Sequence, residues 1–173
     1  IRAMREGYRV IGLRRGWAGI VELSQEKNAD NSGNYVELTQ IIVNRAGRTG
    51  GTFLHSSRTR PSHLPKDRVP EQHRDTYNEE FNDMTKVVLD NLAFLGVDYL
   101  IPIGGDDTLS YAVRLYKEGF KVVAIPKTMD NDIPWVGQSF GFSTAVHKAA
   151  ELISEMYTEA CSTRRVCVIE LFG

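Results

Sequence analysis

The stretch from residue 97 to residue 132 most constrains what this chain can fold into. It begins with an apolar run at residues 97–103, and the segment after that run carries apolar residues at helical spacing as far as Gly119. A second apolar run follows at residues 122–125, before a proline. A strand, a helix and a second strand joined by so short a crossover predict two parallel strands that are neighbours in one sheet.

Two aspartates follow each of these apolar runs. Asp106 and Asp107 come after the first run, and Asp130 and Asp132 come after the second. Because ligands of such sheets bind at the carboxyl ends of the strands, we expect both pairs to face one site. Crowded carboxylates raise one another's pKa or require a cation. The pattern therefore predicts either magnesium that bridges them to a phosphate, or one aspartate that acts as a base.

Residues suited to an anion lie beside these aspartates. Lys127 adds a compact positive charge, and Gly104 and Gly105 leave main-chain N–H groups able to approach the same anion. The helix that opens at Asp106 directs the positive end of its dipole there, and Thr108 lies in its first turn. Together these features predict phosphoryl transfer to a hydroxyl, in which positioning and charge neutralisation provide most of the catalysis.

A purely structural interpretation of the same residues stays open. Asp107 and Thr108 can cap a helix, and residues 126–132 can form a polar turn, because aspartate is a favoured N-cap and Asp-Asn-Asp suits turns. Each half of this interpretation explains its own segment. Both halves together, at two adjacent strand ends, are less economical than one functional site.

Strand-like and helix-like segments alternate through the rest of the chain. From residue 8 to residue 171 this alternation predicts an α/β fold, with a doubly wound, mainly parallel sheet flanked by helices. We expect residues 16–19 to form a glycine-bounded loop, in which Trp17 is either core filler or part of a site. A capping box at Thr76 predicts a helix that runs from there to Gly96.

Residues 50–58 are interpreted as a glycine-opened strand that runs into two hydroxyls and Arg58. The arginine is either solvated or able to grip a phosphate with its forked donors. Cys161 and Cys167 lack metal-ligand spacing, so we expect both to be reduced and structural.

The charge and hydropathy of the chain exclude some partners. The net charge of -1 and the lack of a basic run predict no binding to nucleic acid or to a membrane surface. The sequence contains neither a run of about 18 apolar residues nor a signal peptide, so we expect a cytoplasmic protein. Ile1 falls in what looks like a helix, and an apolar run stops at Gly173. We therefore expect a fragment of a longer chain.

Several motifs resemble those of the phosphofructokinase family. They are GGDDT at 104–108, PKTMDND at 126–132, GFSTA at 141–145 and VIELFG at 168–173, and GGTFLHSSR at 50–58 is similar to the family's nucleotide-side loop. The PKTMDND block is highly specific, whereas a lone GGD would not be. The resemblance implies a three-layer α/β sandwich and a kinase that acts on fructose 6-phosphate.

The resemblance also implies roles for residues of the central stretch. Asp130 would be the base that takes the proton from the 1-hydroxyl of fructose 6-phosphate, and Asp132 would support it. Thr128 would hydrogen-bond near the transferred phosphoryl group. Asp106 would hold Mg²⁺, in part through water.

Outside that stretch, the resemblance implies residues for donor and sugar. Arg58 and Trp17 match positions that line the phosphoryl-donor pocket. Arg165 matches an arginine that reaches the sugar phosphate of a neighbouring subunit, which implies a homodimer or homotetramer. Phe172 and Gly173 match the start of a sugar-binding Met-Gly-Arg turn, in which this chain has Phe in place of Met.

Two positions bear on the identity of the donor. In family members that use ATP the position of Asp107 is commonly glycine, and that of Lys127 is glycine in many bacterial members. An aspartate would clash with the inner phosphates of a nucleotide, while a lysine can hold the end of a short donor. The pair resembles the pyrophosphate-dependent branch, with an ATP-dependent enzyme as the alternative.

Two more distant alternatives concern the activity itself. A non-catalytic nucleotide-binding regulatory module would need a damaged base, and both Asp130 and Asp132 are present. A kinase for NAD or lipids would share only the GGD turn. We expect residues 1–173 to be part of the larger, donor-binding N-terminal domain. The family's first glycine-rich loop and its sugar-binding second half are not in this sequence, so the chain alone should be inactive.

Overall fold

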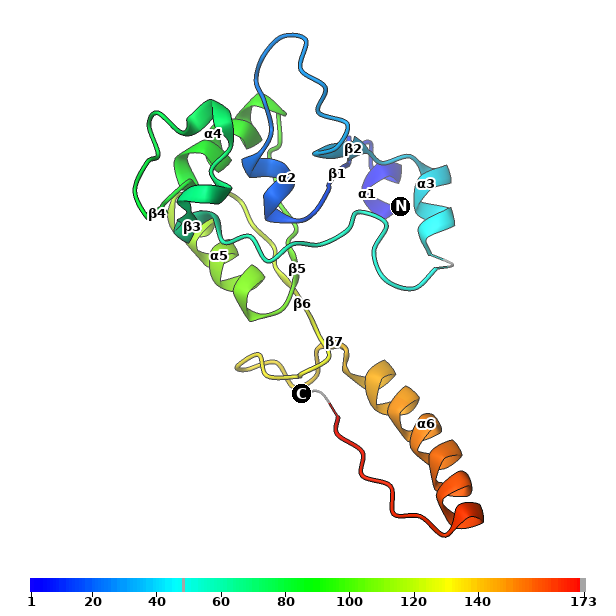
Figure 1. Cartoon of the computed structure of the whole chain (residues 1–173). Helices are drawn as coiled ribbons and strands as arrows, with labels where there is room; N and C mark the ends of the chain where they lie inside the picture. The colour runs from blue at the N-terminus through cyan, green and yellow to red at the C-terminus, as the bar shows by residue number, and fades with distance from the viewer. Residues whose placement is uncertain (48, 172–173) are drawn as a thin grey trace. The chain divides into compact units, whose positions relative to one another are not determined.

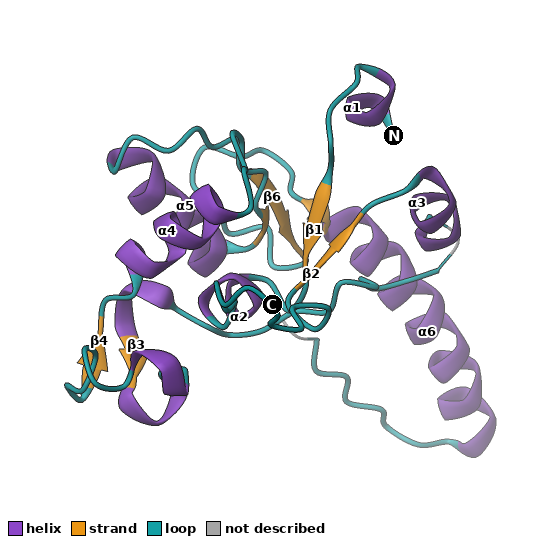
Figure 2. Cartoon of the chain, turned by 90° about the horizontal axis from the view of Figure 1, so that it is seen from above, coloured by secondary structure: helices purple, strands orange, loops and turns teal. Residues whose placement is uncertain are grey.

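The computed structural model describes residues 1–47 and 49–171, which form two compact units (Figure 1). Unit 1 is Ile1–Asp98 and unit 2 is Tyr99–Gly173. Figure 2 shows the same chain with helices in purple and strands in orange.

Unit 1 combines short helices with two small antiparallel ladders. Its elements are α1 (Arg2–Arg5), β1 (Ile11–Leu13), α2 (Trp17–Val21), β2 (Tyr35–Glu37), α3 (Gln40–Ala46), η1 (Pro61–His63), β3 (Leu64–Pro65), η2 (Lys66–Arg68), η3 (Glu71–His73), β4 (Phe81–Asn82) and α4 (Thr85–Phe94). β1 pairs with β2, with Gly12 opposite Val36, and β3 pairs with β4.

The core of unit 1 lies where α2, α4 and η1 contact one another. These elements bring together apolar side chains at helical spacing, which is the periodicity that predicts a buried face. The fully buried side chains here include Ile20, Val21, Leu64, Met84, Val88 and Leu92. Met84 N also donates a 2.7 Å hydrogen bond to Pro61 O, which fixes the start of α4 against η1.

Unit 2 contains the parallel sheet. Its elements are β5 (Ile103–Gly104), α5 (Asp106–Lys117), β6 (Ile125–Thr128), β7 (Phe140–Gly141) and α6 (Phe142–Thr163). The strand order is β5-β6-β7, and both pairings are parallel. α5 contacts β5 and β6, and α6 contacts β7. The predicted strand–helix–strand unit and the α/β class are confirmed.

The strand boundaries differ from those predicted. The pairing begins before β5, because Leu100 bridges Val122 in parallel, and Leu100 N donates to Lys121 O at 2.9 Å. Pro126 does not end the second strand. Pro126 pairs with Gly104 of β5, while β7 joins the sheet only from Lys127 onward. Pro126 therefore has a neighbouring strand on one side only, so its lack of an N–H removes no hydrogen bond to β7.

Three local predictions in unit 1 were wrong. Residues 17–21 form α2 rather than a loop, with Gly16 at a φ of 55° immediately before the helix. The predicted helix at Thr76 starts only at Thr85, where Asp83 Oδ1 accepts a 2.9 Å hydrogen bond from Thr85 N. Residues 50–58 contain no assigned strand.

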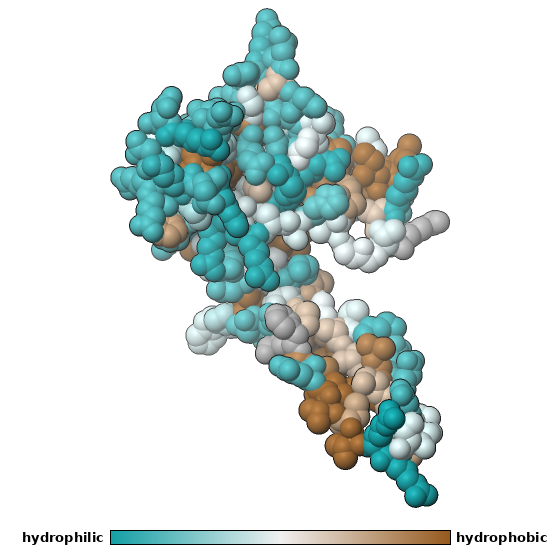
Figure 3. Space-filling model, viewed as in Figure 1, coloured by the Kyte–Doolittle hydropathy of each residue, from teal (hydrophilic) through white to brown (hydrophobic). Residues whose placement is uncertain are grey.

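The helix α6, which follows β7, carries apolar side chains that are not buried. None of the described residues of α6 is buried, and Val146, Leu152, Met156 and Tyr157 are exposed. Figure 3 shows apolar atoms on the surface of the part that holds α6. Residues 166–171 form neither helix nor strand, and Cys161 and Cys167 are free and exposed.

Among the described residues, no helix combines the length and the apolar character needed to cross a bilayer.

Candidate active site

The ends of β5 and β6 form the edge at which the sequence places its two aspartate pairs. Gly104 lies opposite Pro126 in the parallel register, so the two strands end close together. A Cβ built on Gly105 would lie 3.7 Å from Thr128 Cβ, and one on Gly141 would lie 3.6 Å from Thr128 O. The turn after β5, the end of β6 and the end of β7 therefore converge around Thr128.

Asp106 and Asp107 are the first two residues of α5, directly after its N-cap Gly105. Both side chains are exposed. Carboxylates in a first turn stabilise a helix through its dipole, so these two residues have a structural role whatever else they do. Thr108, half-buried, packs on Gly104, because a Cβ built there would lie only 2.5 Å from Thr108 Oγ1.

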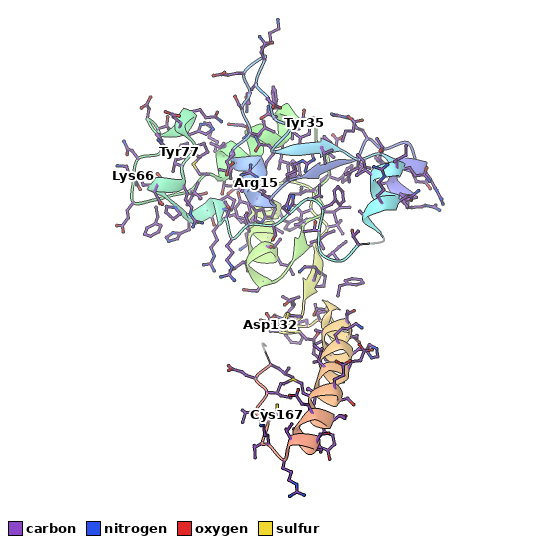
Figure 4. The ribbon with its side chains drawn as sticks, turned by 45° about the vertical axis from the view of Figure 1, so that its right-hand side comes forward. Arg15, Tyr35, Lys66, Tyr77, Asp132 and Cys167 are labelled. Atoms are coloured by element: carbon purple, nitrogen blue, oxygen red, sulfur yellow. The ribbon has the colours of Figure 1, made fainter. Side chains whose placement is uncertain are left out.

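Asp130 and Asp132 lie in the loop that follows β6, and both are exposed. Figure 4 labels Asp132 in this loop. The main chain of Asp130 is held by Thr128, because Asp130 N donates a 3.1 Å hydrogen bond to Thr128 Oγ1. Lys127 projects from β6 as an exposed side chain. Unit 2 thus brings the predicted base to the same sheet edge as those predicted donor-binding residues that lie in this unit.

The predicted donor residues of unit 1 lie on two segments that contact each other. Trp17 is 8% exposed and lies on α2, in agreement with its core interpretation, whereas Arg58 is exposed. Arg15 N donates to Leu54 O at 2.7 Å, and Ser57 Oγ donates to Arg15 O at 2.7 Å. These bonds join the turn before Trp17 to the segment before Arg58.

The predicted sugar-binding residues lie at the end of the chain. Arg165 is exposed after α6, and its main-chain N donates to Ala160 O at 3.0 Å. Phe172 and Gly173 lie outside the described residues.

The carboxylate oxygens at the sheet edge suit a magnesium ion that is bound partly by the protein and partly by substrate oxygens. Within residues 1–47 and 49–171, no group of three or more His, Cys, Asp or Glu side chains is arranged to hold a metal. Mg²⁺ commonly takes only one or two protein carboxylates and completes its shell with water and phosphate oxygens. Asp106 offers one exposed carboxylate, at a helix start beside the converging strand ends, which is compatible with a site of that kind.

Sequence reasoning missed two residues of this edge, Asn131 and Ser139. Ser139 Oγ donates a 2.8 Å hydrogen bond to Thr128 O, and Ser139 N donates one of 2.8 Å to Asn131 Oδ1. A serine before a strand of two residues has no distinctive pattern, and Asn131 looks like an ordinary turn residue. The only local signal is that asparagine tolerates a positive φ, and Asn131 has a φ of 53°.

The sequence is similar to known proteins along its whole length. A family profile described as "Phosphofructokinase" matches residues 1–173. A Streptomyces coelicolor protein named "Pyrophosphate--fructose 6-phosphate 1-phosphotransferase" is 40% identical over 168 residues, which cover 96% of this chain and 41% of that protein. A second relative of this chain from the same organism, named "ATP-dependent 6-phosphofructokinase 3", is 38% identical over 167 residues, which cover 96% of this chain and 41% of that protein.

A pyrophosphate-named relative from Dictyoglomus thermophilum is 35% identical over 173 residues, covering 100% of this chain and 42% of that protein. The chain thus spans about two fifths of the length of the curated relatives that it matches. Relatives named for either donor match at similar identity, so overall similarity does not distinguish the donors.

Proposed function

This chain belongs to the phosphofructokinase family, and we propose that the protein containing it transfers a phosphoryl group from inorganic pyrophosphate to the 1-hydroxyl of fructose 6-phosphate. The products are fructose 1,6-bisphosphate and orthophosphate. The observation that carries this proposal is the parallel register of β5 and β6, which brings the GGDDT and PKTMDND segments to one edge. The profile match over residues 1–173 supports it.

The residues at this edge have the chemistry that the reaction requires. The 1-hydroxyl oxygen of the sugar attacks the terminal phosphorus of pyrophosphate, and the bond from that phosphorus to the bridging oxygen breaks. Asp130 accepts the hydroxyl proton, and orthophosphate leaves with the bridging oxygen. Asp132 supports the base, and Thr128 provides a hydroxyl beside the transferred group.

Other residues of the edge neutralise and orient the donor. Lys127 attracts its terminal phosphate, and the N-terminal end of α5 directs main-chain N–H groups from Gly105 onward at an anion. Asp106 would hold Mg²⁺, whose charge offsets that of the donor oxygens.

The choice of donor rests on Asp107 and Lys127. Both are exposed at the sheet edge, Asp107 on the first turn of α5 and Lys127 on β6. A carboxylate near the inner phosphates repels a nucleotide, whereas a lysine favours a short anionic donor. The comparable identity to ATP-dependent relatives supports ATP as the alternative donor. Because pyrophosphate and the phosphoester product are closer in free energy than ATP and that product, the proposed step is reversible.

The proposal extends to the arrangement of the parent protein. Residues 1–173 would form part of its donor-binding N-terminal domain, with Trp17 and Arg58 on the donor side. Arg165, Phe172 and Gly173 would contribute to the sugar site, where Arg165 would serve a neighbouring subunit in a cytoplasmic homodimer or homotetramer.

Steady-state assays of the full-length protein test the function. Fructose 6-phosphate is supplied with Mg²⁺ and either pyrophosphate or ATP, and fructose 1,6-bisphosphate is measured. We expect a higher kcat/KM with pyrophosphate. A preference for ATP overturns the donor assignment, and inactivity with both donors overturns the proposed reaction.

A further inference from the structure

The loop that carries Asp130 and Asp132 is anchored by two buried side chains. Thr128 and Ser139, at its two ends, are 9% and 3% exposed. The aspartates between them are exposed. A buried hydroxyl in a native protein is normally hydrogen-bonded, because an unpaired one loses its hydration without compensation. The partners of these two hydroxyls therefore show what the burial maintains.

Both hydroxyls bond to the main chain of the loop itself. Ser139 Oγ donates to Thr128 O at 2.8 Å, and Thr128 Oγ1 accepts from Asp130 N at 3.1 Å. Asn131 adds a third connection, since its Oδ1 accepts from Ser139 N at 2.8 Å. Its positive φ of 53° turns the chain immediately after Asp130. Asp130 thus lies between two residues that are each bonded to Ser139.

The hydrogen bonds of Ser139 to Thr128 and Asn131 form a clamp around Asp130, and this clamp is fixed to the sheet. Ser139 directly precedes β7, which pairs with β6 through Lys127 opposite Phe140 and Thr128 opposite Gly141. The bonds from Ser139 therefore tie the sheet to the main chain of Thr128 and to the side chain of Asn131, on either side of Asp130. Residues 132–138 are exposed or half-buried, so they provide little packing to do the same.

We propose that Asn131 and Ser139 are positioning residues for the phosphoryl transfer. They hold the main chain around Asp130 so that its carboxylate meets the sugar hydroxyl. This inference rests on the proposed function. Neither residue is proposed to touch a substrate, so each acts through Asp130. A small displacement of a catalytic group, on the order of 1 Å, can cost a large factor in rate, about a hundredfold.

The test uses three variants of the full-length protein. Ser139→Ala removes the bond to Thr128 O, Asn131→Gly removes the Oδ1 acceptor while tolerating the positive φ, and Ser139→Thr retains the hydroxyl. Gln138→Ala is the matched control. It removes a side-chain bond of the same loop, to Ser143, without touching Thr128, Asn131 or Ser139.

We expect kcat to fall about tenfold or more in Ser139→Ala and Asn131→Gly, with KM for both substrates within about twofold. Ser139→Thr should recover most of the rate, and Gln138→Ala should match the wild type. Ser139→Ala and Asn131→Gly break the same clamp. The fall in kcat of the double variant should therefore be smaller than the product of the two single falls.

Different outcomes identify different failures. Wild-type kcat in Ser139→Ala and Asn131→Gly overturns the inference and leaves the proposed function intact. A fall in kcat that accompanies a lower melting temperature and weaker pyrophosphate binding assigns a structural role and also overturns it. A wild-type protein inactive with both donors overturns the proposed function, and the inference with it.

Discussion

Ser57 Oγ donates a 2.7 Å hydrogen bond to the main-chain oxygen of Arg15, across 42 positions of sequence. Arg15 N in turn donates to Leu54 O at 2.7 Å. The two segments proposed to line the donor pocket therefore support each other within unit 1. Both turn through strained backbone, because Arg15 and His55 have positive φ values of 56° and 62°. Strained residues persist only where their surroundings hold them, and they concentrate at functional sites.

Ser57→Ala should weaken donor binding more than the chemical step. Without its hydroxyl the segment that leads to Arg58 is held to Arg15 by one bond fewer. We expect KM for pyrophosphate to rise several-fold, in line with about 1 kcal/mol for one hydrogen bond, while kcat stays within about twofold. Steady-state kinetics of the full-length protein measure both constants. Ser57→Thr keeps the hydroxyl and should behave like the wild type, and an unchanged KM in Ser57→Ala would contradict the prediction.

Gly104→Ala should destabilise the turn between β5 and α5. The added Cβ would lie 2.5 Å from Thr108 Oγ1 and 2.7 Å from Thr108 Cβ, so the first turn of α5 would have to shift. Overpacking of this kind costs about 1–3 kcal/mol of unfolding free energy. Urea denaturation measures the loss. Gly137→Ala is the control from the same unit, because nothing lies within 4 Å of the Cβ it would add; equal effects in the two variants would refute the steric argument.

Asn91 links α4 to the end of α2, so Asn91→Ala should destabilise unit 1. The side chain is 1% exposed, and its Nδ2 donates a 2.7 Å hydrogen bond to Ile20 O. That carbonyl belongs to the last turn of α2, where helix carbonyls lack partners within the helix. A buried carbonyl left unsatisfied costs about 1–3 kcal/mol, which chemical denaturation can resolve. The exposed neighbour Asp90→Ala should have little effect, and a loss of equal size there would count against this account.

Acidification should weaken unit 1 through His73. Burial lowers the pKa of this imidazole in the folded chain, whereas the unfolded value stays near about 6.5. As the pH falls through about 6.5, the unfolded chain therefore binds a proton before the folded chain does, and stability decreases. Denaturation midpoints between about pH 8 and about pH 5.5 should show this slope, and His73→Gln should flatten it. Parallel curves for the two proteins would exclude His73 as the cause.

The sequence predicted those elements whose signals are local. The helix at 106–117 carries acidic residues at its start, helical periodicity and a glycine soon after its end, and the structure contains it as α5. The predicted start of α4 was wrong because Thr76 has a better local capping pattern than the residues before Thr85, where the helix begins. In the structure the segment before α4 instead forms β4, whose Phe81 pairs with Pro65, and such distant pairing leaves no local signal.

The placement of the candidate site residues at adjacent strand ends was predictable for the same reason. Asp106 and Asp130 follow apolar runs, so chain order alone places them at adjacent strand ends. Ser139 could not be found in this way, because its role depends on a bond to Thr128, eleven positions away. Asn91 was likewise hidden, since a polar residue on a helix predicts a solvated position and not a link to α2.

The donor prediction concerns Asp107 and Lys127 together. Replacing both by glycine removes the carboxylate that is proposed to repel a nucleotide and the ammonium that is proposed to hold a short donor. The variant should therefore lose pyrophosphate activity by about tenfold to a hundredfold, because the lost Lys127 contact to the donor is worth about 1.5–3 kcal/mol. Parallel assays with pyrophosphate and ATP measure the ratio of the two kcat/KM values, and unchanged kinetics would refute the assignment.

The single variants separate the two contributions. Lys127→Gly should raise KM for pyrophosphate without raising kcat/KM for ATP, because it removes an attraction and relieves no repulsion. Asp107→Gly should raise kcat/KM for ATP and change kcat/KM for pyrophosphate less, because only the longer donor extends past that carboxylate. Asp107 also stabilises the N-terminus of α5, so Asp107→Ser, which can still cap a helix, controls for loss of the helix start. If Asp107→Ser and Asp107→Gly both leave ATP use unchanged, Asp107 is a helix-stabilising residue and does not select the donor.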